Sequence, residues 1–120
     1  MSDRPILIVD DDAFVRTLLR DMLAGHGYEL REAENGREAL ALPGPPPRVV
    51  LLDLLMPQMS GMEALGLIRD RWPETPVLVI SSMDSDRLVQ EALEAGATGY
   101  ITKPFHPVEI ASAVERALAL

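Results

Sequence analysis

The chain has 120 residues and a formal net charge of −8, with 48% hydrophobic and 25% charged residues. This length fits a single domain over residues 1–120 that needs no disulfide or structural metal. The acidic charge argues against nucleic acid and anionic membranes as direct partners. The sequence has no cysteine, no segment long enough to span a bilayer and no signal peptide, which predicts a cytoplasmic protein.

Short apolar runs predict the strands. Four of them cover residues 6–9, 49–52, 77–80 and 99–102. The first three are rich in β-branched residues and contain no polar residue, a pattern typical of parallel strands buried on both faces. Residues 28–32 alternate in polarity and predict a fifth, weaker strand.

Between these runs, apolar residues recur with helical spacing. The predicted helices cover residues 14–23, 39–42, 62–68, 88–93 and 108–118. Asp12 is the expected N-cap of the first helix, and Pro107 sets the first turn of the last one. Strands that alternate with helices in this way predict an α/β fold, in which helices cover both faces of a parallel sheet.

Polar residues follow four of the predicted strands. Asp10 and Asp11 come after the first, Asp53 after the run at 49–52, Ser81 after the next, and Lys103 after the last. Ligands of an open parallel sheet bind at the carboxyl ends of its strands, so these side chains are expected to share one site.

The charges of this expected site suggest its chemistry. Asp10, Asp11 and Asp53 carry −3, and close carboxylates repel one another unless a cation neutralises them. Carboxylate oxygens suit Mg²⁺, which together with Lys103 would supply +3. One carboxylate of the neutralised pocket could then act as a nucleophile and hold a phosphoryl group, whose oxygens the metal, Lys103 and Ser81 would bind.

Four segments carry a family resemblance. They are ILIVDDD (6–12), LLDLLMPQMSGME (51–63), VLVISS (77–82) and GATGYITKPF (96–105). In this order and spacing the chain resembles the receiver domain of bacterial two-component response regulators over nearly its whole length. The resemblance implies a doubly wound, flavodoxin-like (βα)5 fold whose five parallel strands are ordered 2-1-3-4-5.

The resemblance also implies a role for each acidic residue. Asp53 corresponds to the phosphoacceptor. Asp11 corresponds to a direct Mg²⁺ ligand, and Asp10 acts on the metal mainly through water. The backbone carbonyl of Leu55 is expected to complete the protein ligands of the metal.

The same resemblance implies a switch. Lys103 would bind the phosphoryl group, and its peptide bond to Pro104 is expected to be cis. Ser81 would turn its hydroxyl toward that group, and Tyr100 would move inward with it. The face formed by the fourth helix, the fifth strand and the fifth helix would then change.

The resemblance further implies the partners. The phosphoryl donor would be a sensor histidine kinase or a histidine phosphotransfer protein, and an output domain or partner protein would read the changed face. A phosphorylation-dependent homodimer is a further expectation. The domain would take part in its own phosphorylation and dephosphorylation without being an enzyme in the ordinary sense.

Other interpretations of the same residues stay open at this stage. Asp10, Asp11 and Asp12 could belong only to a loop and a helix cap, and Asp53 could be a turn residue. An FMN-binding protein would need a phosphate loop where the chain has three aspartates. An aspartate-nucleophile phosphatase would use two aspartates spaced as Asp10 and Asp12 are, and a pseudo-receiver would bind partners without phosphorylation.

Several positions depart from the common family pattern. Arg48 stands where an acidic residue is frequent, Ser82 replaces a smaller residue, and His106 takes the place of the usual helix cap. Leu55 and Met83 stand two residues after Asp53 and Ser81, and neither side chain can hydrogen-bond an attacking water. We therefore expect slow hydrolysis of the aspartyl phosphate.

Overall fold

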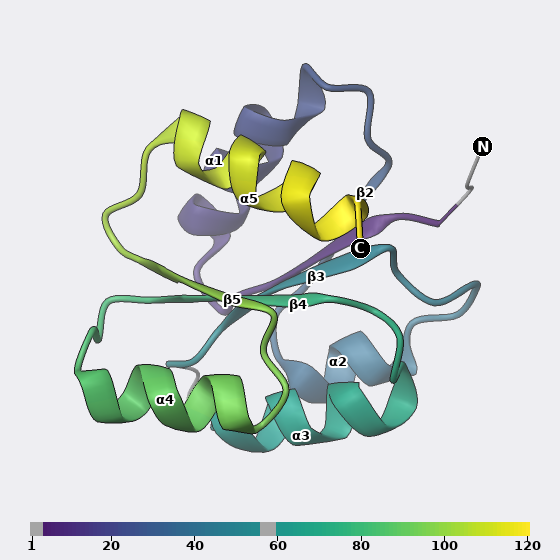
Figure 1. Cartoon of the computed structure of the whole chain (residues 1–120). Helices are drawn as coiled ribbons and strands as arrows, with labels where there is room; N and C mark the ends of the chain where they lie inside the picture. The colour runs from purple at the N-terminus through teal and green to yellow at the C-terminus, as the bar shows by residue number, and fades with distance from the viewer. Residues whose placement is uncertain (1–3, 56–59) are drawn as a thin grey trace.

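The computed structural model describes residues 4–55 and 60–120, and its strands form one parallel sheet (Figure 1). The strands are β1 (Ile6–Val9), β2 (Leu30–Ala33), β3 (Val49–Asp53), β4 (Val77–Ser81) and β5 (Gly99–Thr102). Their order in the sheet is β2-β1-β3-β4-β5, and every neighbouring pair is parallel. The predicted α/β class and the implied strand order are both confirmed.

Helices cover both faces of the sheet. They are α1 (Ala13–Ala24), α2 (Gly36–Ala41), α3 (Gly61–Arg71), α4 (Asp86–Glu94) and α5 (Pro107–Leu118). Helices α1 and α5 lie on one face, and α2, α3 and α4 lie on the other (Figure 1). Among the residues that the structure describes, no helix combines the length and the apolar character needed to cross a bilayer.

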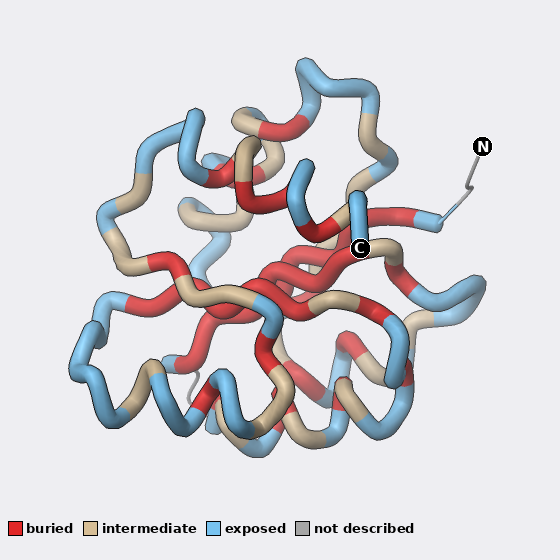
Figure 2. The backbone as a smooth tube through the Cα atoms, viewed as in Figure 1, coloured by how far each residue is buried: buried red, intermediate tan, exposed pale blue. Residues whose placement is uncertain are grey.

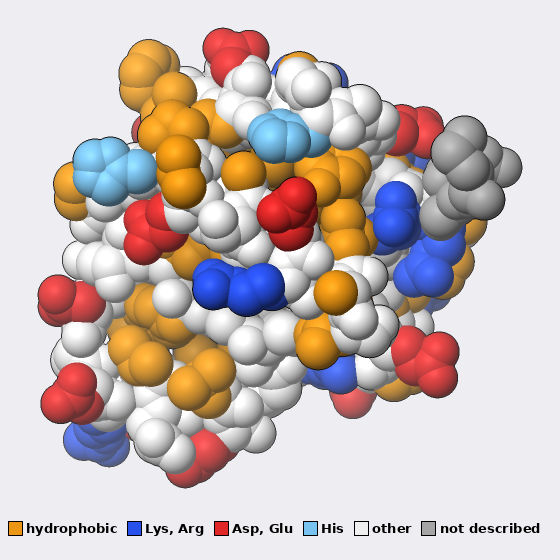
Figure 3. Space-filling view, turned by 45° about the horizontal axis from the view of Figure 1, so that its top comes forward, with side chains coloured by type: hydrophobic (Ala, Val, Ile, Leu, Met, Phe, Trp, Pro, Cys, Tyr) orange, Lys and Arg blue, Asp and Glu red, His pale blue; other side chains and the backbone are white. Residues whose placement is uncertain are grey.

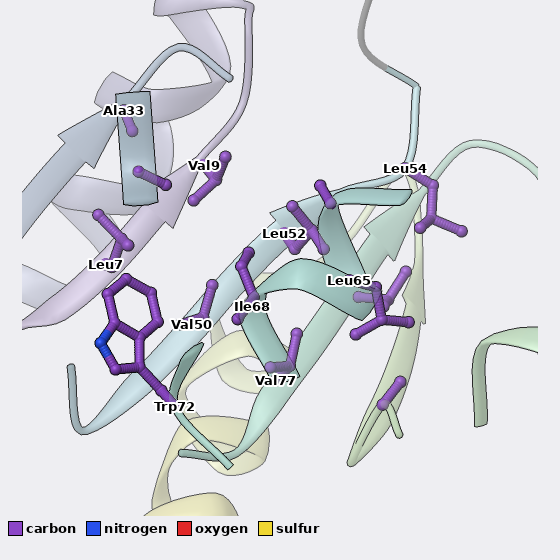
Figure 4. Close-up of a cluster of buried hydrophobic side chains, with 14 of the residues drawn as sticks. Leu7, Val9, Ala33, Val50, Leu52, Leu54, Leu65, Ile68, Trp72 and Val77 are labelled. Carbon is purple, nitrogen blue, oxygen red and sulfur yellow. The ribbon is translucent and has the colours of Figure 1, made fainter. Parts of the chain in front are cut away.

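The sheet separates two apolar layers. Strands β1, β3 and β4 are buried along their whole length, and Figure 2 shows them as the buried centre of the molecule. Their side chains alternate between the layers: Leu7 packs toward α3, whereas Ile8 packs toward α1 and α5. Trp72, at the end of α3, closes the first layer beside Leu7 and Val50 (Figure 4).

The edge strand β2 differs from its prediction. It covers Leu30–Ala33 instead of 28–32, because Leu30 is the residue that pairs with Ile6 of β1. Tyr28 lies before the strand, where its ring stacks on His26 with the centroids 5.9 Å apart. The pairing with β1 therefore decides where this half-exposed strand begins.

The helix ends follow local capping chemistry. The Asp12 carboxylate accepts a hydrogen bond from the Phe14 backbone N–H at 2.9 Å and caps α1, as predicted. Helix α2 begins earlier than expected because Asn35 caps it through the Glu38 N–H. His106 occupies the N-cap position of α5. The peptide bond from Lys103 to Pro104 is cis, as the resemblance implied.

Candidate functional site

The three predicted carboxylates meet at the carboxyl ends of the strands. Asp10 and Asp11 follow β1, and Asp53 is the last residue of β3. One carboxylate oxygen from each lies within 4.8 Å of the other two. Asp10 and Asp53 are buried, whereas Asp11 is exposed, so the cluster is open to solvent on the side of Asp11.

Lys103 reaches this cluster from the end of β5. Its Nζ atom lies 3.4 Å from Oδ2 of Asp10 and 3.6 Å from Oδ1 of Asp53. The predicted convergence of the acidic residues and the lysine is therefore present in the fold. The ammonium group bridges two buried carboxylates and partly offsets their mutual repulsion.

Backbone groups orient Asp10. Its Oδ1 atom accepts a hydrogen bond from the Asp12 N–H at 2.9 Å, while its carbonyl accepts one from Nη1 of Arg16 at 2.7 Å. Arg16 also bonds to Glu32 of β2 at 3.1 Å. Sequence reasoning missed Arg16, because nothing in a helical stripe indicates that a polar residue turns back to the preceding loop.

Burial shifts the ionisation of Asp53. Removal from water is the main cause that raises its pKa, from the ordinary value of 3.8 to about 6. The Leu55 N–H, which donates to Oδ1 at 3.1 Å, opposes this rise, and so does Lys103. The negative charges of Asp10 and Asp11 add to it. Asp53 thus lies where an added cation would strongly favour its charged form.

The site has the composition that a divalent metal requires. The three carboxylates of Asp10, Asp11 and Asp53 are hard oxygen ligands close enough to share one ion. The single lysine leaves the cluster with a net charge of about −2 when all three carboxylates are ionised. A divalent cation would neutralise this excess, so the residues present fit Mg²⁺.

Ser81 and Tyr100 both bond to the backbone of Met83. Ser81 is completely buried, and its Oγ atom accepts a hydrogen bond from the Met83 N–H at 3.1 Å. The Tyr100 hydroxyl donates to the Met83 carbonyl oxygen at 2.6 Å. The two residues with predicted switch roles are therefore linked through one residue of the loop between β4 and α4. Their predicted movement stays a prediction.

Leu55 and Met83 are the two apolar residues predicted to affect hydrolysis. Each of these residues is 48% exposed. Residues 56–59 of the motif at 51–63 lie outside the described residues.

Comparison with known proteins identifies the family. Residues 6–115 match the model of the response regulator receiver domain family. The chain is 40% identical over 113 residues to the chemotaxis protein CheY of Thermotoga maritima, an alignment that covers 92% of this chain and 94% of that protein. It is also 42% identical to the regulatory protein AtoC of Escherichia coli, of which it covers 25%.

A solved structure supports the same assignment. The structure of chemotaxis protein CheY4 of Vibrio cholerae superposes on this chain with a TM-score of 0.89 and 33% sequence identity. The alignment covers 98% of this chain and 100% of the CheY4 chain. Phosphorylation on an aspartate is typical of this family, whose members are signalling domains that partner with histidine kinases and output domains. The chain therefore belongs to the response regulator receiver domains.

Proposed function

We propose that residues 1–120 form one cytoplasmic receiver domain that accepts a phosphoryl group on Asp53. The convergence of Asp10, Asp11, Asp53 and Lys103 at one edge of the sheet carries this proposal. Among these groups, Asp53 is the one that belongs to the central strand β3, and the lysine ammonium lies 3.6 Å from one of its oxygens. The donor is a phosphohistidine of a sensor kinase or of a phosphotransfer protein.

The transfer forms one bond and breaks another. A carboxylate oxygen of Asp53 attacks phosphorus, the phosphorus–nitrogen bond to the donor imidazole breaks, and the imidazole leaves with its electron pair. Lys103 lies where its ammonium can bind a phosphoryl oxygen and offset the developing charge. The product is an aspartyl phosphate, and the domain acts as acceptor in the reaction without turning over a substrate as an ordinary enzyme does.

Mg²⁺ is the cation that we assign to the carboxylates. Asp11 and Asp53 would hold it directly, Asp10 mainly through water, and the Leu55 carbonyl would supply a backbone oxygen. When bound, the metal would neutralise carboxylate charge and bind a phosphoryl oxygen. Asp10 is held for this role by the Asp12 N–H, and its buried position keeps its orientation fixed.

Phosphorylation would be transmitted through Ser81 and Tyr100. An aspartyl phosphate adds acceptor oxygens to which the Ser81 hydroxyl can donate, and turning toward them would draw its Oγ atom away from the Met83 N–H, whose hydrogen bond it now accepts. Movement of Ser81 would alter the Met83 loop to which Tyr100 is bonded. The face of α4, β5 and α5 would then change and be recognised by an output domain, a partner protein or a second phosphorylated copy.

Acetyl phosphate separates this proposal from its rivals. The protein is incubated with acetyl phosphate and Mg²⁺, and its intact mass is measured alongside Asp53→Asn as the control. We expect one phosphoryl adduct on the wild type and none on the variant. A pseudo-receiver would gain no adduct, and a phosphatase that uses Asp10 or Asp12 would be labelled in the Asp53→Asn variant as well. Either result would refute the proposal.

The coupling route has its own test. Ser81→Ala removes the hydroxyl and leaves Asp53 and the carboxylates in place. We expect this variant to be phosphorylated but to lose most of the phosphorylation-dependent binding of its partner. If Ser81→Ala keeps full phosphorylation-dependent binding, the signal does not pass through this hydroxyl.

A further inference from the structure

The exposed carboxylate of the cluster, Asp11, depends on the backbone for its position. Backbone N–H groups bond to the carboxylates of Asp10 and Asp53 and hold them in place. Among the residues that the structure describes, the Asp11 carboxylate accepts no hydrogen bond and forms no ion pair. Its distance from the other two carboxylates is therefore set by the peptide unit that joins Asp10 to Asp11.

That peptide unit is anchored from two sides. The Asp10 N–H donates to the Ala33 carbonyl at the end of β2, at 3.1 Å. The Asp10 carbonyl belongs to the peptide unit that continues into Asp11, and it accepts a hydrogen bond from Nη1 of Arg16 at 2.7 Å. A charged donor makes this second bond stronger than a bond between two neutral groups. Arg16 lies on α1, so the loop is tied both to the edge strand and to the helix that follows the loop.

The Arg16 guanidinium is held in turn by Glu32 of β2. Its Nε atom donates to Oε1 of Glu32 at 3.1 Å, while Nε of Arg20 donates to Oε2 at 2.7 Å. Burial raises the pKa of Glu32, but the bonds and charges of the two arginines outweigh it and hold that pKa below its ordinary value. Glu32 is therefore ionised at neutral pH and fixes the plane of the guanidinium that bonds to the loop.

The burial of Arg16 sets it apart from most charged residues. On the face that Figure 3 shows, acidic and basic side chains are scattered over the surface, where water solvates them. The Arg16 side chain is only 13% exposed. An arginine withdrawn from water needs partners for its charge and its donors, and Glu32 and the Asp10 carbonyl supply them. Arg16 thus occupies a defined position instead of a solvated one.

We propose that Arg16, held by Glu32, is a positioning residue that sets the affinity of the carboxylate cluster for Mg²⁺. This inference rests on the proposed function, because it takes the cluster as the metal site. Arg16 bonds to the Asp10 carbonyl and to none of the three carboxylates. It acts by fixing the direction in which Asp11 leaves the loop. Ligands that are in place before the metal binds give higher affinity, since binding then orders less of the chain.

The sign of the effect separates positioning from charge. Arg16 is a cation, so its removal would by itself strengthen the binding of another cation nearby. We expect Arg16→Met instead to raise the dissociation constant of Mg²⁺ about tenfold. Arg16→Lys should raise it as well, because one ammonium keeps the charge but lacks the fork that reaches both Glu32 and the Asp10 carbonyl.

NMR measures these dissociation constants without any phosphoryl donor. Amide resonances of Asp11 and Leu55 are followed while Mg²⁺ is added to the wild type and to each variant. Weaker binding by both variants supports positioning. Unchanged or tighter binding by Arg16→Lys would overturn the proposal, even if Arg16→Met failed to fold.

Arg20→Met is the matched control. It removes the same charge from the same helix and also breaks an ion pair with Glu32, but Arg20 bonds only to Glu32 and to the Leu30 carbonyl. We expect its dissociation constant for Mg²⁺ to stay within about twofold of the wild-type value. A loss of affinity equal to that of Arg16→Met would show that the ion pairs of β2, and not the bond to the loop, set the affinity, and would refute the proposal.

Acetyl phosphate separates this inference from the proposed function. In Arg16→Met, the Mg²⁺ concentration that gives half the maximal rate of adduct formation should rise about tenfold. The rate at saturating Mg²⁺ should stay that of the wild type, because Asp53 and Lys103 are unchanged. A lower saturating rate with an unchanged half-saturating concentration would refute the inference.

The two proposals can also fail separately. A wild type that gains no adduct refutes the proposed function, whereas the NMR titration still tests the role of Arg16. Equal Mg²⁺ affinity in the wild type and both Arg16 variants, together with a normal adduct on the wild type, refutes this inference and leaves the proposed function standing.

Discussion

The Asp53 carboxyl group lies in a buried position where ionisation is unfavourable. Its pKa rises from 3.8 to about 6, mainly through burial, because the Leu55 N–H and Lys103 compensate only in part. A carboxyl whose pKa is higher in the folded than in the unfolded state stabilises the fold at low pH. That contribution is complete below about pH 4 and is lost as the pH rises through about 6.

Replacement of Asp53 by asparagine should therefore stabilise the metal-free protein at neutral pH. The difference between the two pKa values corresponds to at most about 3 kcal/mol in the free energy of unfolding. We expect the free energy of unfolding of Asp53→Asn to exceed that of the wild type by almost nothing at about pH 4 and by most above about pH 7. Thermal or urea unfolding in EDTA across this range measures it, and an advantage independent of pH would contradict the assigned pKa.

Leu55 and Met83 should affect how long the phosphoryl group persists. Leu55→Asn introduces a side chain that can hydrogen-bond an attacking water. One such hydrogen bond should accelerate hydrolysis of the aspartyl phosphate about tenfold. Loss of the phosphoryl group is followed by intact mass after the donor is removed. Leu67→Asn, a change at an exposed leucine of α3, is the matched control. Unchanged or slower decay in Leu55→Asn would refute this hypothesis.

At the scale of elements, helix α3 begins in close contact with the chain that leaves β3. The Gly61 N–H donates to the Leu54 carbonyl at 2.9 Å. A Cβ atom at Gly61 would lie 2.1 Å from the Leu54 Cα atom, a backbone atom that no rotamer change can move. The absence of a side chain at Gly61 therefore determines how α3 packs beside the segment that carries Asp53.

Two glycine-to-alanine substitutions in α3 test this contact. Gly61→Ala should lower the free energy of unfolding by about 2 kcal/mol or more, because the backbone must shift to relieve the overlap. Gly66→Ala should raise it by about 0.5–1 kcal/mol, since no atom lies within 4 Å of its added Cβ and alanine is the better helix former. Urea unfolding of both variants measures whether the free energy of unfolding falls for Gly61→Ala and rises for Gly66→Ala. Equal changes in the two variants would contradict the close approach of Gly61 to Leu54.

At the scale of the whole molecule, the sheet places acidic and basic groups at opposite ends. Asp10, Asp11 and Asp53 gather at the carboxyl ends of the strands, whereas Arg4 and Arg48 stand where strands begin. The apolar layers between the ends are continuous, and they keep the two charged regions apart. The carboxylate end should therefore respond to cations.

Magnesium should stabilise the entire fold through the carboxylate end. A ligand that binds only the folded state raises the free energy of unfolding by about 2.7 kcal/mol when its concentration is about 100 times its dissociation constant. We expect Mg²⁺ to raise the melting temperature of the wild type at neutral pH and EDTA to reverse the rise. Asp11→Asn should show a much smaller rise, and an equal rise in both proteins would exclude the proposed site.

Much of the fold can be predicted from the sequence for a simple physical reason. Strands β1, β3 and β4 are buried on both faces, so each appears as an uninterrupted apolar run whose limits are clear. Each run is followed by its own polar residues, and parallel strands bring those residues to one edge. The meeting of Asp10 and Asp53 is predictable for this reason, and Lys103 joins them because it follows the parallel strand β5.

Other features depend on contacts between distant segments. The start of β2 depends on its register with β1. The Arg16 bond to the Asp10 carbonyl joins a helix to a loop. Arg48 and Arg69 line one depression because the start of β3 and the end of α3 lie at the same end of the sheet. The sequence by itself determined the elements and the chemistry at the strand ends, because burial and strand polarity act locally. Only the tertiary structure decided which backbone atoms hold Asp53 and which arginines share a wall, because those depend on packing between elements.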